Sequence, residues 1–379
     1  MNWAKELVCP RTGTRDRLTK LHNLSPAGAP WLVEYELTRE RGRRLLRSLA
    51  RRPWTLWRYH ELLPVEDPER RIDLGEGGTP LVELDSVLTQ GHRVWLKQEA
   101  GNPTGSFKAR GLSLAINRAR ELGAPGVRLP SAGNAAIAAS AYAAACGMPC
   151  RVAVPADTPE NVITRIRSYG ARVDAVGKTL VESGQWLAEQ APELLDVSTL
   201  REPYRLEGKK TMGFELAEQF GWNLPEWILY PTGGGTGLIG IPKAFDELEA
   251  LGLVGKRRPR MVSVQMSGCA PIVKAFHEGR DSAEPWLEPD TRVWGLRVPR
   301  AVGDFLVLRA LRATHGTAIA VGEQDVEEAG RTLPKATGLE WGPEGAACWV
   351  AFQELVAGGK VEPDDRVVIL QTGHPSNYG

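Results

Sequence analysis

Lys108 stands in a polar turn that leads directly into a helix-like stretch, within the segment 102–111 (NPTGSFKARG). A lysine is costly to bury unless it is paired or neutral. One chemistry that makes use of such a lysine is condensation of its amine with an aldehyde. The alternative is a surface lysine in a polar turn, and the segment taken alone favours that alternative. Three features further along the chain change the balance.

The first of these features is a glycine-rich turn at residues 231–237 (PTGGGTG), directly after the apolar segment 227–230. Glycines let backbone N–H groups approach a phosphate closely, and the N-terminus of a following helix adds a favourable dipole. The turn lacks the Gly-Lys-Ser/Thr of a Walker loop and the fingerprint of a dinucleotide site. We therefore predict a phosphate-binding site at Gly233, Gly234, Gly235, Thr236 and Gly237. The alternatives are a site for a nucleotide phosphate and a tight turn that binds no ligand.

The other two features are polar residues that follow strand-like segments. Asn134 ends the segment 131–134 (SAGN), and Thr372 lies in the segment 371–374 (QTGH). The amide of Asn134 can hydrogen-bond the phenolate-type oxygen of a pyridoxal ring, and the hydroxyl of Thr372 can hydrogen-bond its pyridine nitrogen. A helix N-cap and a turn threonine are the respective alternatives. Together with Lys108 and the glycine turn, these residues predict a pyridoxal phosphate site.

Short β-branched segments alternate with Ala- and Leu-rich helical segments along the chain. This alternation predicts an α/β fold with a largely parallel sheet covered on both faces, and ligands in such folds lie beyond the carboxyl ends of the strands. We expect strands at 93–97, 127–130, 151–154, 172–176, 227–230, 261–265 and 367–370. We expect helices at 105–122 after a turn, 135–146, 160–169 and 238–251, and a long loop at about 280–300.

The composition excludes several classes of protein. The 379 residues carry 47 Lys and Arg against 46 Asp and Glu, so the net charge of +1 predicts no binding of nucleic acid or of acidic membranes. No apolar run approaches the roughly 20 residues that cross a bilayer. The first residues lack the basic-then-apolar order of a signal peptide. The five cysteines are scattered without Cys-x-x-Cys spacing, which argues against a disulfide framework. We therefore expect a cytoplasmic protein.

The first 75 residues differ in composition from the rest of the chain, since they are rich in arginine and tryptophan. Seven arginines lie on a predicted helix at 39–52, most simply as a solvated face, with a phosphate or nucleic-acid surface as the alternative. Trp54, Trp57 and Tyr59 follow and supply apolar area for docking on the main body or on a second subunit.

The chain resembles the threonine synthases of the fold-type II pyridoxal phosphate family over nearly its whole length. The matching motifs are 76–81 (EGGTPL), 102–111, 131–134, 205–211 (RLEGKKT), 231–237, 303–305 (GDF), 343–347 (PEGAA) and 372–373 (TG). The resemblance implies a tryptophan synthase β-like fold with two parallel-type αβα domains and the cofactor between them. It divides the chain into an N-terminal extension (1–75), a large cofactor-binding domain (76–120 and 201–379) and a small domain (121–200).

The resemblance also implies roles for individual residues. Lys108 is the lysine that binds the cofactor covalently and then serves as the catalytic base. Arg205 falls where the family has an arginine that grips the phosphate of O-phosphohomoserine. The other cofactor-binding residues are Phe107, Asn134, Gly233, Gly234, Gly235, Thr236, Gly237 and Thr372, and the substrate-binding set adds Ser106, Ser131, Gly133, Ala135 and His374.

Several positions depart from the family pattern. Ala109, Ala135 and Ala136 stand where relatives often carry an aspartate or hydroxyl residues, which removes donors for a substrate carboxylate or phosphate. Many relatives begin with a four-cysteine zinc site, whereas here Cys9 alone remains and the segment 24–28 (LSPAG) takes the place of the second pair. We interpret this start as a decayed zinc knuckle and predict no metal. The tail 374–377 (HPSN) also differs from the usual ending of the family.

These features predict a threonine synthase that converts O-phospho-L-homoserine and water to L-threonine and phosphate, acting on a small amino-acid substrate as a homodimer. A hydroxyl at the ring nitrogen, in place of a carboxylate, suits elimination and replacement better than transamination. A β-replacement or deaminating lyase that acts on serine, threonine or an O-activated amino acid is the main alternative. A non-catalytic protein, or one that binds a nucleotide phosphate at the glycine turn, is the remaining one.

Overall fold

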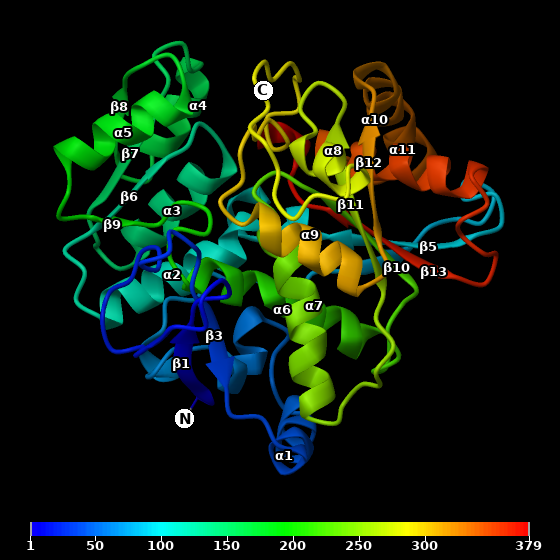
Figure 1. Ribbon diagram of the computed structural model, residues 1–379, viewed down its shortest axis with the longest axis horizontal. Helices are drawn as coiled ribbons and strands as arrows, with labels where there is room; N and C mark the ends of the chain where they lie inside the picture. Colours follow the sequence, from blue (N-terminus) through cyan, green and yellow to red (C-terminus); the bar gives the residue numbers. More distant parts are fainter. Residues whose placement is uncertain (1, 378–379) are drawn as a thin grey trace. The chain divides into compact units, whose positions relative to one another are not determined.

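The β-branched segments of the sequence form two parallel sheets in the computed structural model, which describes residues 2–377 (Figure 1). By their internal contacts the described residues divide into two units. The first unit comprises the chain up to Gly78 together with Asn102–Thr211, and the second comprises Thr79–Gly101 and the chain from Met212 onwards. These units group residues 102–120 with residues 121–200, which the predicted domains separate. The predicted domain ranges, whose ends at Met1 and residues 378–379 lie outside the described residues, stay a prediction.

The first unit begins with a small antiparallel sheet that the sequence did not lead us to expect. Its strand order is β2-β1-β3, with β1 at Ala4–Val8, β2 at Arg15–Asp16 and β3 at Leu32–Tyr35. Cys9 follows β1 and is buried, and its Sγ lies 3.2 Å from the Oγ of Ser25. Ser25 belongs to the segment 24–28, so a hydroxyl faces the Cys9 thiol. Among the described residues no three His, Cys, Asp or Glu side chains cluster as metal ligands.

The arginine-rich helix α1 spans Arg39–Leu49 and packs through Gly42, Leu45 and Leu49, so its arginines face outward. The side chain of Thr38 accepts a hydrogen bond from the amide of Arg41 and caps its N-terminus. Two short 3₁₀ turns follow, η1 at Leu56–Leu62 and η2 at Pro68–Arg70.

The parallel sheet of the first unit has the order β8-β7-β6-β9. The three strands predicted here agree with β6, β7 and β8 within one residue at each end, whereas β9 was not predicted. Figure 1 shows α3, α4 and α5 beside this sheet. The strands are β6 at Val127–Pro130, β7 at Cys150–Val154, β8 at Arg172–Ala175 and β9 at Leu195–Asp196. The helices are α2 at Lys108–Glu121, α3 at Asn134–Ala145, α4 at Glu160–Arg167 and α5 at Leu180–Gln190.

The second unit contains a six-stranded sheet of order β12-β11-β10-β13-β5-β4, in which only the β4–β5 pair is antiparallel. The strands are β4 at Leu81–Glu83, β5 at Arg93–Gln98, β10 at Trp227–Pro231, β11 at Arg260–Met266, β12 at Thr317–Val321 and β13 at Arg366–Gln371. The helices are α7 at Thr236–Ala250, α8 at Pro271–His277, α9 at Asp304–Ala313, α10 at Glu323–Thr337 and α11 at Pro343–Ala357. Helix α6 at Tyr204–Gln219 belongs to the first unit up to Thr211 and to the second from Met212. The short turns are η3 at Glu99–Gly101, η4 at Pro103–Gly105 and η5 at Pro375–Asn377. As predicted, the chain between α8 and α9 forms no helix or strand.

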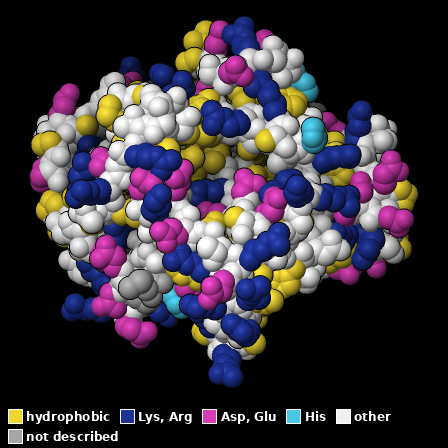
Figure 2. Space-filling view, turned by 60° about the horizontal axis from the view of Figure 1, so that its bottom comes forward, with side chains coloured by type: hydrophobic (Ala, Val, Ile, Leu, Met, Phe, Trp, Pro, Cys, Tyr) yellow, Lys and Arg dark blue, Asp and Glu magenta, His cyan; other side chains and the backbone are white. Residues whose placement is uncertain are grey.

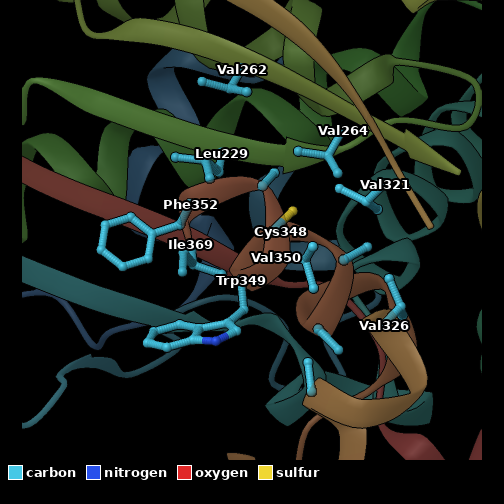
Figure 3. Packing of buried hydrophobic residues seen from close by; sticks show 14 of the residues in the cluster. Leu229, Val262, Val264, Val321, Val326, Cys348, Trp349, Val350, Phe352 and Ile369 are labelled. Carbon is cyan, nitrogen blue, oxygen red and sulfur yellow. The ribbon is translucent and has the colours of Figure 1, made fainter. Parts of the chain in front are cut away.

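One hydrophobic cluster of the second unit lies between this sheet and α11. Cys348, Trp349, Val350 and Phe352 of α11 pack against strand residues such as Leu229 and Ile369 (Figure 3). All of these side chains are removed from water, which stabilises the sheet by roughly 25 cal/mol for each Å² of apolar surface buried. The parallel α/β class predicted from the sequence is therefore confirmed.

One buried ion pair fixes β5 within the second unit. The Nζ of Lys97 donates to the carbonyl of Thr79 at 2.7 Å, to Glu215 Oε2 at 2.8 Å and to Gln219 Oε1 at 2.9 Å. Both charged side chains are fully buried. Because all three protons of the ammonium group have acceptors, the pair meets the condition under which a buried charge is tolerated.

On the face shown in Figure 2, basic and acidic side chains are interspersed, in keeping with the net charge of +1. No helix in the described part of the chain combines the length and the apolar character needed to cross a membrane.

Candidate functional site

The turn before α2 holds Lys108 at the start of a helix, as the sequence predicts. Thr104 and Gly105 both adopt left-handed backbone conformations, with φ of 65° and 72°, and they reverse the chain just before α2. Ser106 is buried, and its Oγ accepts a long hydrogen bond of 3.4 Å from the amide of Lys108. Lys108 itself is half-buried, with its Nζ 4.6 Å from the centre of the Phe107 ring. Lys108, Phe107 and Ser106 are therefore neighbours at one helix start.

A second lysine reaches the same place from α6. The buried Nζ of Lys209 donates to the carbonyl of Phe107 and lies 3.4 Å from the centre of its ring. Two glycines permit this approach: a methyl at Gly111 would lie 2.8 Å from the carbonyl oxygen of Arg205, and one at Gly208 would lie 2.7 Å from the carbonyl carbon of Arg110. The backbones of α2 and α6 thus nearly touch. Sequence reasoning missed Lys209, because only this crossing brings it to Phe107.

The first residue of the EGGTPL motif, Glu76, is a buried carboxylate that ties several elements of the first unit together. It accepts hydrogen bonds from Trp57 Nε1 at 3.0 Å, from the Tyr142 hydroxyl at 2.7 Å and from Ser113 Oγ. Burial raises its pKa, and the hydrogen bonds from Ser113 and Tyr142 oppose that rise. The next amide, of Gly77, donates to Asn102 Oδ1 at 2.9 Å. Glu76 therefore supports the turn that carries Lys108.

The segment of Ser131, Gly133, Asn134 and Ala135 lies at the carboxyl end of β6, where a ligand site is expected in this class of fold. All four residues are partly exposed, whereas the rest of α3 from Ala136 to Ala143 is buried. The N-cap position is Gly133, and Asn134 is the first helical residue, so the capping alternative for Asn134 does not hold.

Arg205 lies in the first turn of α6 and is 1 % exposed. Its Nη1 donates to the carbonyl of Val197 at 2.8 Å, and its amide donates to Glu202 Oε1 at 2.9 Å. Burial raises the pKa of Glu202 to about 7, while the amides of Tyr204 and Arg205 and the charge of Arg205 oppose the rise. The guanidinium is thus held by groups of its own unit, and its predicted contact with a substrate phosphate stays a prediction.

The glycine turn joins β10 to α7 in the second unit. Gly235 is the N-cap of α7 with a left-handed φ of 76°, and no side chain caps this end of the helix. Within residues 2–377, the amides of Gly233, Gly234, Gly235 and Thr236 donate to no other backbone or side-chain acceptor. Gly233 also packs tightly against the 280–300 loop, since a methyl there would lie 2.5 Å from the carbonyl oxygen of Gly295. Four unsatisfied donors at a helix N-terminus fit an anionic group such as phosphate.

Thr372 and His374 follow β13, also in the second unit. Thr372 is buried directly beyond the carboxyl end of the strand, as predicted for a binding residue. His374 lies on the tail, where its Nδ1 is 2.7 Å from Ser376 Oγ and its Nε2 forms an ion pair with Glu340. The tail therefore has a defined conformation around His374.

Comparison with known proteins establishes the family. The family model described as pyridoxal-phosphate dependent enzyme matches residues 72–373. The chain belongs to this family. Its relatives include the threonine synthase of Methanocaldococcus jannaschii, which is 32 % identical over 86 % of this chain and 82 % of its own length. The threonine synthase of Methanosarcina acetivorans is 33 % identical over 84 % of this chain and 79 % of its own length.

Solved structures agree on the fold. The T.th. threonine deaminase has a TM-score of 0.64 with 28 % identity, over 78 % of this chain and 92 % of that one. The processed threonine deaminase isoform 2 from Solanum lycopersicum has a TM-score of 0.68 and covers 97 % of this chain and 95 % of its own. Its sequence identity is 19 %, so it supports the fold alone.

The protein is accordingly a pyridoxal phosphate-dependent lyase of the threonine synthase-like, fold-type II kind, with pyridoxal 5'-phosphate as its cofactor. Its residues fit that cofactor. The first unit offers an amine at a helix start and the exposed end of β6, and the second offers the unsatisfied amides of the glycine turn.

Proposed function

We propose that the protein is a threonine synthase, which converts O-phospho-L-homoserine and water to L-threonine and phosphate. The observation that carries this proposal is the similarity to threonine synthases of 32–33 % over about 80 % of their length, joined with Lys108 at the start of α2. When bound, the cofactor supplies an electron-withdrawing ring that stabilises negative charge on the substrate carbons.

We assign Lys108 as the residue that attaches the cofactor and then moves protons at the substrate Cα. An amine held at one helix start is within reach of that carbon without the entropy cost of a free base. The amides of the glycine turn bind the cofactor phosphate, Asn134 binds the ring oxygen and Thr372 the ring nitrogen, with Phe107 beside Lys108. We assign the substrate to Ser106, Ser131, Gly133, Ala135, Arg205 and His374.

In this assignment Arg205 binds the substrate phosphate, because a guanidinium matches two phosphate oxygens at once. Substrate binding would then replace the hydrogen bond that Arg205 now gives to the carbonyl of Val197. Comparing Arg205→Lys with Arg205→Ala tests the role. Loss of turnover in both variants with O-phospho-L-homoserine supports it, and unchanged KM and kcat in Arg205→Ala removes Arg205 from the site.

The competing candidate is a β-replacement or deaminating lyase that acts on serine, threonine or an O-activated amino acid. It is favoured by the half-buried Ala135, which presents no hydroxyl to a substrate, and by the engagement of Arg205 with a backbone carbonyl. One assay separates the two. Purified enzyme receives O-phospho-L-homoserine, L-serine or L-threonine, and phosphate, ammonia and amino-acid products are measured, with Lys108→Ala as the inactive control.

Phosphate release with threonine formation supports the threonine synthase. Ammonia release from serine or threonine, with no reaction of O-phospho-L-homoserine, refutes the threonine synthase proposal and supports the deaminating lyase. We also propose a cytoplasmic homodimer that binds neither nucleic acid nor membranes and holds no metal. Light scattering in solution and elemental analysis of the purified protein test these points.

A further inference from the structure

Gln265 is a buried amide that joins the glycine turn to helix α8, at a strand position that no motif of the sequence marked. It is the penultimate residue of β11 and is fully buried. Its Nε2 donates to the carbonyl of Thr232 at 3.1 Å. Its Oε1 accepts from the amides of Ile272 and Val273 at 2.9 and 3.2 Å. All of these residues belong to the second unit, and Figure 1 shows α8 beside β11.

The partners of Gln265 fix which end of its side-chain amide faces the glycine turn. A backbone N–H only donates and a backbone carbonyl only accepts. The reverse orientation would place the side-chain NH₂ against two N–H groups and the side-chain oxygen against a carbonyl, without any hydrogen bond. The two N–H groups lie in the first turn of α8, where the helix itself supplies no acceptor. The oxygen therefore faces α8 and the nitrogen faces Thr232.

Both backbone groups of Thr232 are held by β11. Its amide donates to the carbonyl of Val264 at 2.8 Å, and its carbonyl accepts from the next residue of the strand, Gln265. Its hydroxyl donates to the carbonyl of Tyr230 at 3.0 Å, and the residue is fully buried. The chain is thus fixed at the point where it leaves β10 and enters the glycine turn.

The carbonyl of Thr232 and the amide of Gly233 belong to one peptide unit. Because a trans peptide is planar, its C=O and N–H point in opposite directions. A carbonyl held toward Gln265 therefore turns the N–H of Gly233 away from β11. That N–H has no acceptor among residues 2–377 and is the first of the unsatisfied donors of the turn. The hydrogen bond from Gln265 thus determines the direction in which the turn presents this donor.

We propose that Gln265 is a positioning residue of the cofactor-phosphate site, which holds the Thr232 carbonyl so that the amide of Gly233 points at the phosphate. The inference rests on the proposed role of the glycine turn in binding that phosphate. It assigns Gln265 no contact with cofactor or substrate. Since the same side chain binds the first turn of α8, the direction of the Gly233 donor also depends on a helix outside the glycine turn.

The test compares two cofactor forms that differ only in the phosphate. Apoprotein is titrated with pyridoxal 5'-phosphate and with pyridoxal, and binding is followed by visible absorbance. Gln265→Met has a similar length and removes the donor to Thr232 without adding a charge. We expect it to weaken the binding of pyridoxal 5'-phosphate about tenfold, the effect of one lost hydrogen bond to a charged group, while the affinity for pyridoxal stays within about twofold.

Thr314→Val is the matched control in the same strand. The hydroxyl of Thr314 is buried and accepts from the amide of Met261 at 3.3 Å, at the amino end of β11. Both variants remove a buried hydrogen bond to this part of the fold and should lower the urea midpoint. Only Gln265→Met should change the ratio of the two cofactor affinities. Equal losses for both cofactor forms in Gln265→Met, or no loss at all, would overturn the inference, as would the same change of ratio in Thr314→Val.

Hydrogen exchange in the wild-type protein keeps the inference testable if Gln265→Met does not fold. We expect pyridoxal 5'-phosphate to protect the amide of Gly233 from exchange and pyridoxal to leave it unprotected. Equal exchange with the two cofactor forms would overturn the inference, because the inference requires this amide to donate to the phosphate. Both experiments measure cofactor binding. A protein that behaves as expected in them but forms no threonine from O-phospho-L-homoserine would therefore refute the proposed function alone.

Discussion

Replacing Gly208 with alanine tests the close crossing of α2 and α6. In an exposed helix interior this change stabilises by up to about 1 kcal/mol, because glycine has the poorer helix propensity. At Gly208 the new methyl would lie 2.7 Å from the carbonyl carbon of Arg110 and 2.9 Å from the Cα of Gly111, which are backbone atoms of α2. Overpacking a core costs typically 1–3 kcal/mol, and a helix backbone yields less than a side chain. We expect a net loss of about 2 kcal/mol.

Urea unfolding measures the effect, and Gly330→Ala is the matched control. Gly330 lies within α10, and a methyl there would meet nothing within 4 Å, so this variant should gain up to about 1 kcal/mol. In Gly208→Ala the displaced α6 should also carry Lys209 away from Phe107, which slows cofactor attachment at Lys108. Equal stabilisation in both variants would refute the reasoning, since it would mean that α2 and α6 are not in contact at this glycine.

Three further predictions concern buried charges. Because the folded-state pKa of Glu202 is raised to about 7, its contribution to the free energy of unfolding is greatest below pH 4.5 and falls by up to roughly 3 kcal/mol as the pH rises through 7. Glu202→Gln should remove this pH dependence, which urea unfolding at several pH values measures. Lys97→Met should cost roughly 3–5 kcal/mol in the same measurement at pH 7, because Glu215 keeps a buried charge; a loss below 1 kcal/mol would contradict this. Lys209→Met should slow cofactor attachment about tenfold, as measured by stopped-flow absorbance, because the hydrogen bond to the Phe107 carbonyl is lost. Lys209→Arg keeps the positive charge and should restore the rate. A rate in Lys209→Arg as low as in Lys209→Met would mean that Lys209 acts only by filling space.

Buried parallel strands such as β10 and β13 could be predicted from sequence because they are continuous apolar runs. Val127–Pro130 was predicted to the residue, and β10 and β13 within one residue at each end. Lys108 at the start of α2 followed from the turn residues before it. Strands β1 to β4, β9 and β12 were not predicted: β2, β4 and β9 have only two or three residues each, and about half of the residues of β1 to β3 are polar.

Residues whose role depends on a distant partner were out of reach. Lys209 matters because it meets Phe107, 102 positions earlier, and Glu76 because it meets Tyr142, 66 positions later. Gly237 shows the converse: the sequence identifies it as a glycine of a phosphate turn, yet its space is taken by Tyr230. Periodicity and turn chemistry report local structure, whereas these contacts depend on tertiary packing.

The hydrogen bonds of Glu76 bear on where the chain can be shortened. The family match begins at residue 72, which invites removal of the preceding arginine- and tryptophan-rich segment. That segment supplies the indole N–H of Trp57 to the Glu76 carboxylate and the amide of Leu56 to the Glu76 carbonyl at 2.7 Å. A trimmed protein would leave this carboxylate with one donor fewer and open to water, next to the residue that tethers the Lys108 turn. The segment before residue 72 therefore stabilises the turn that carries the reactive lysine.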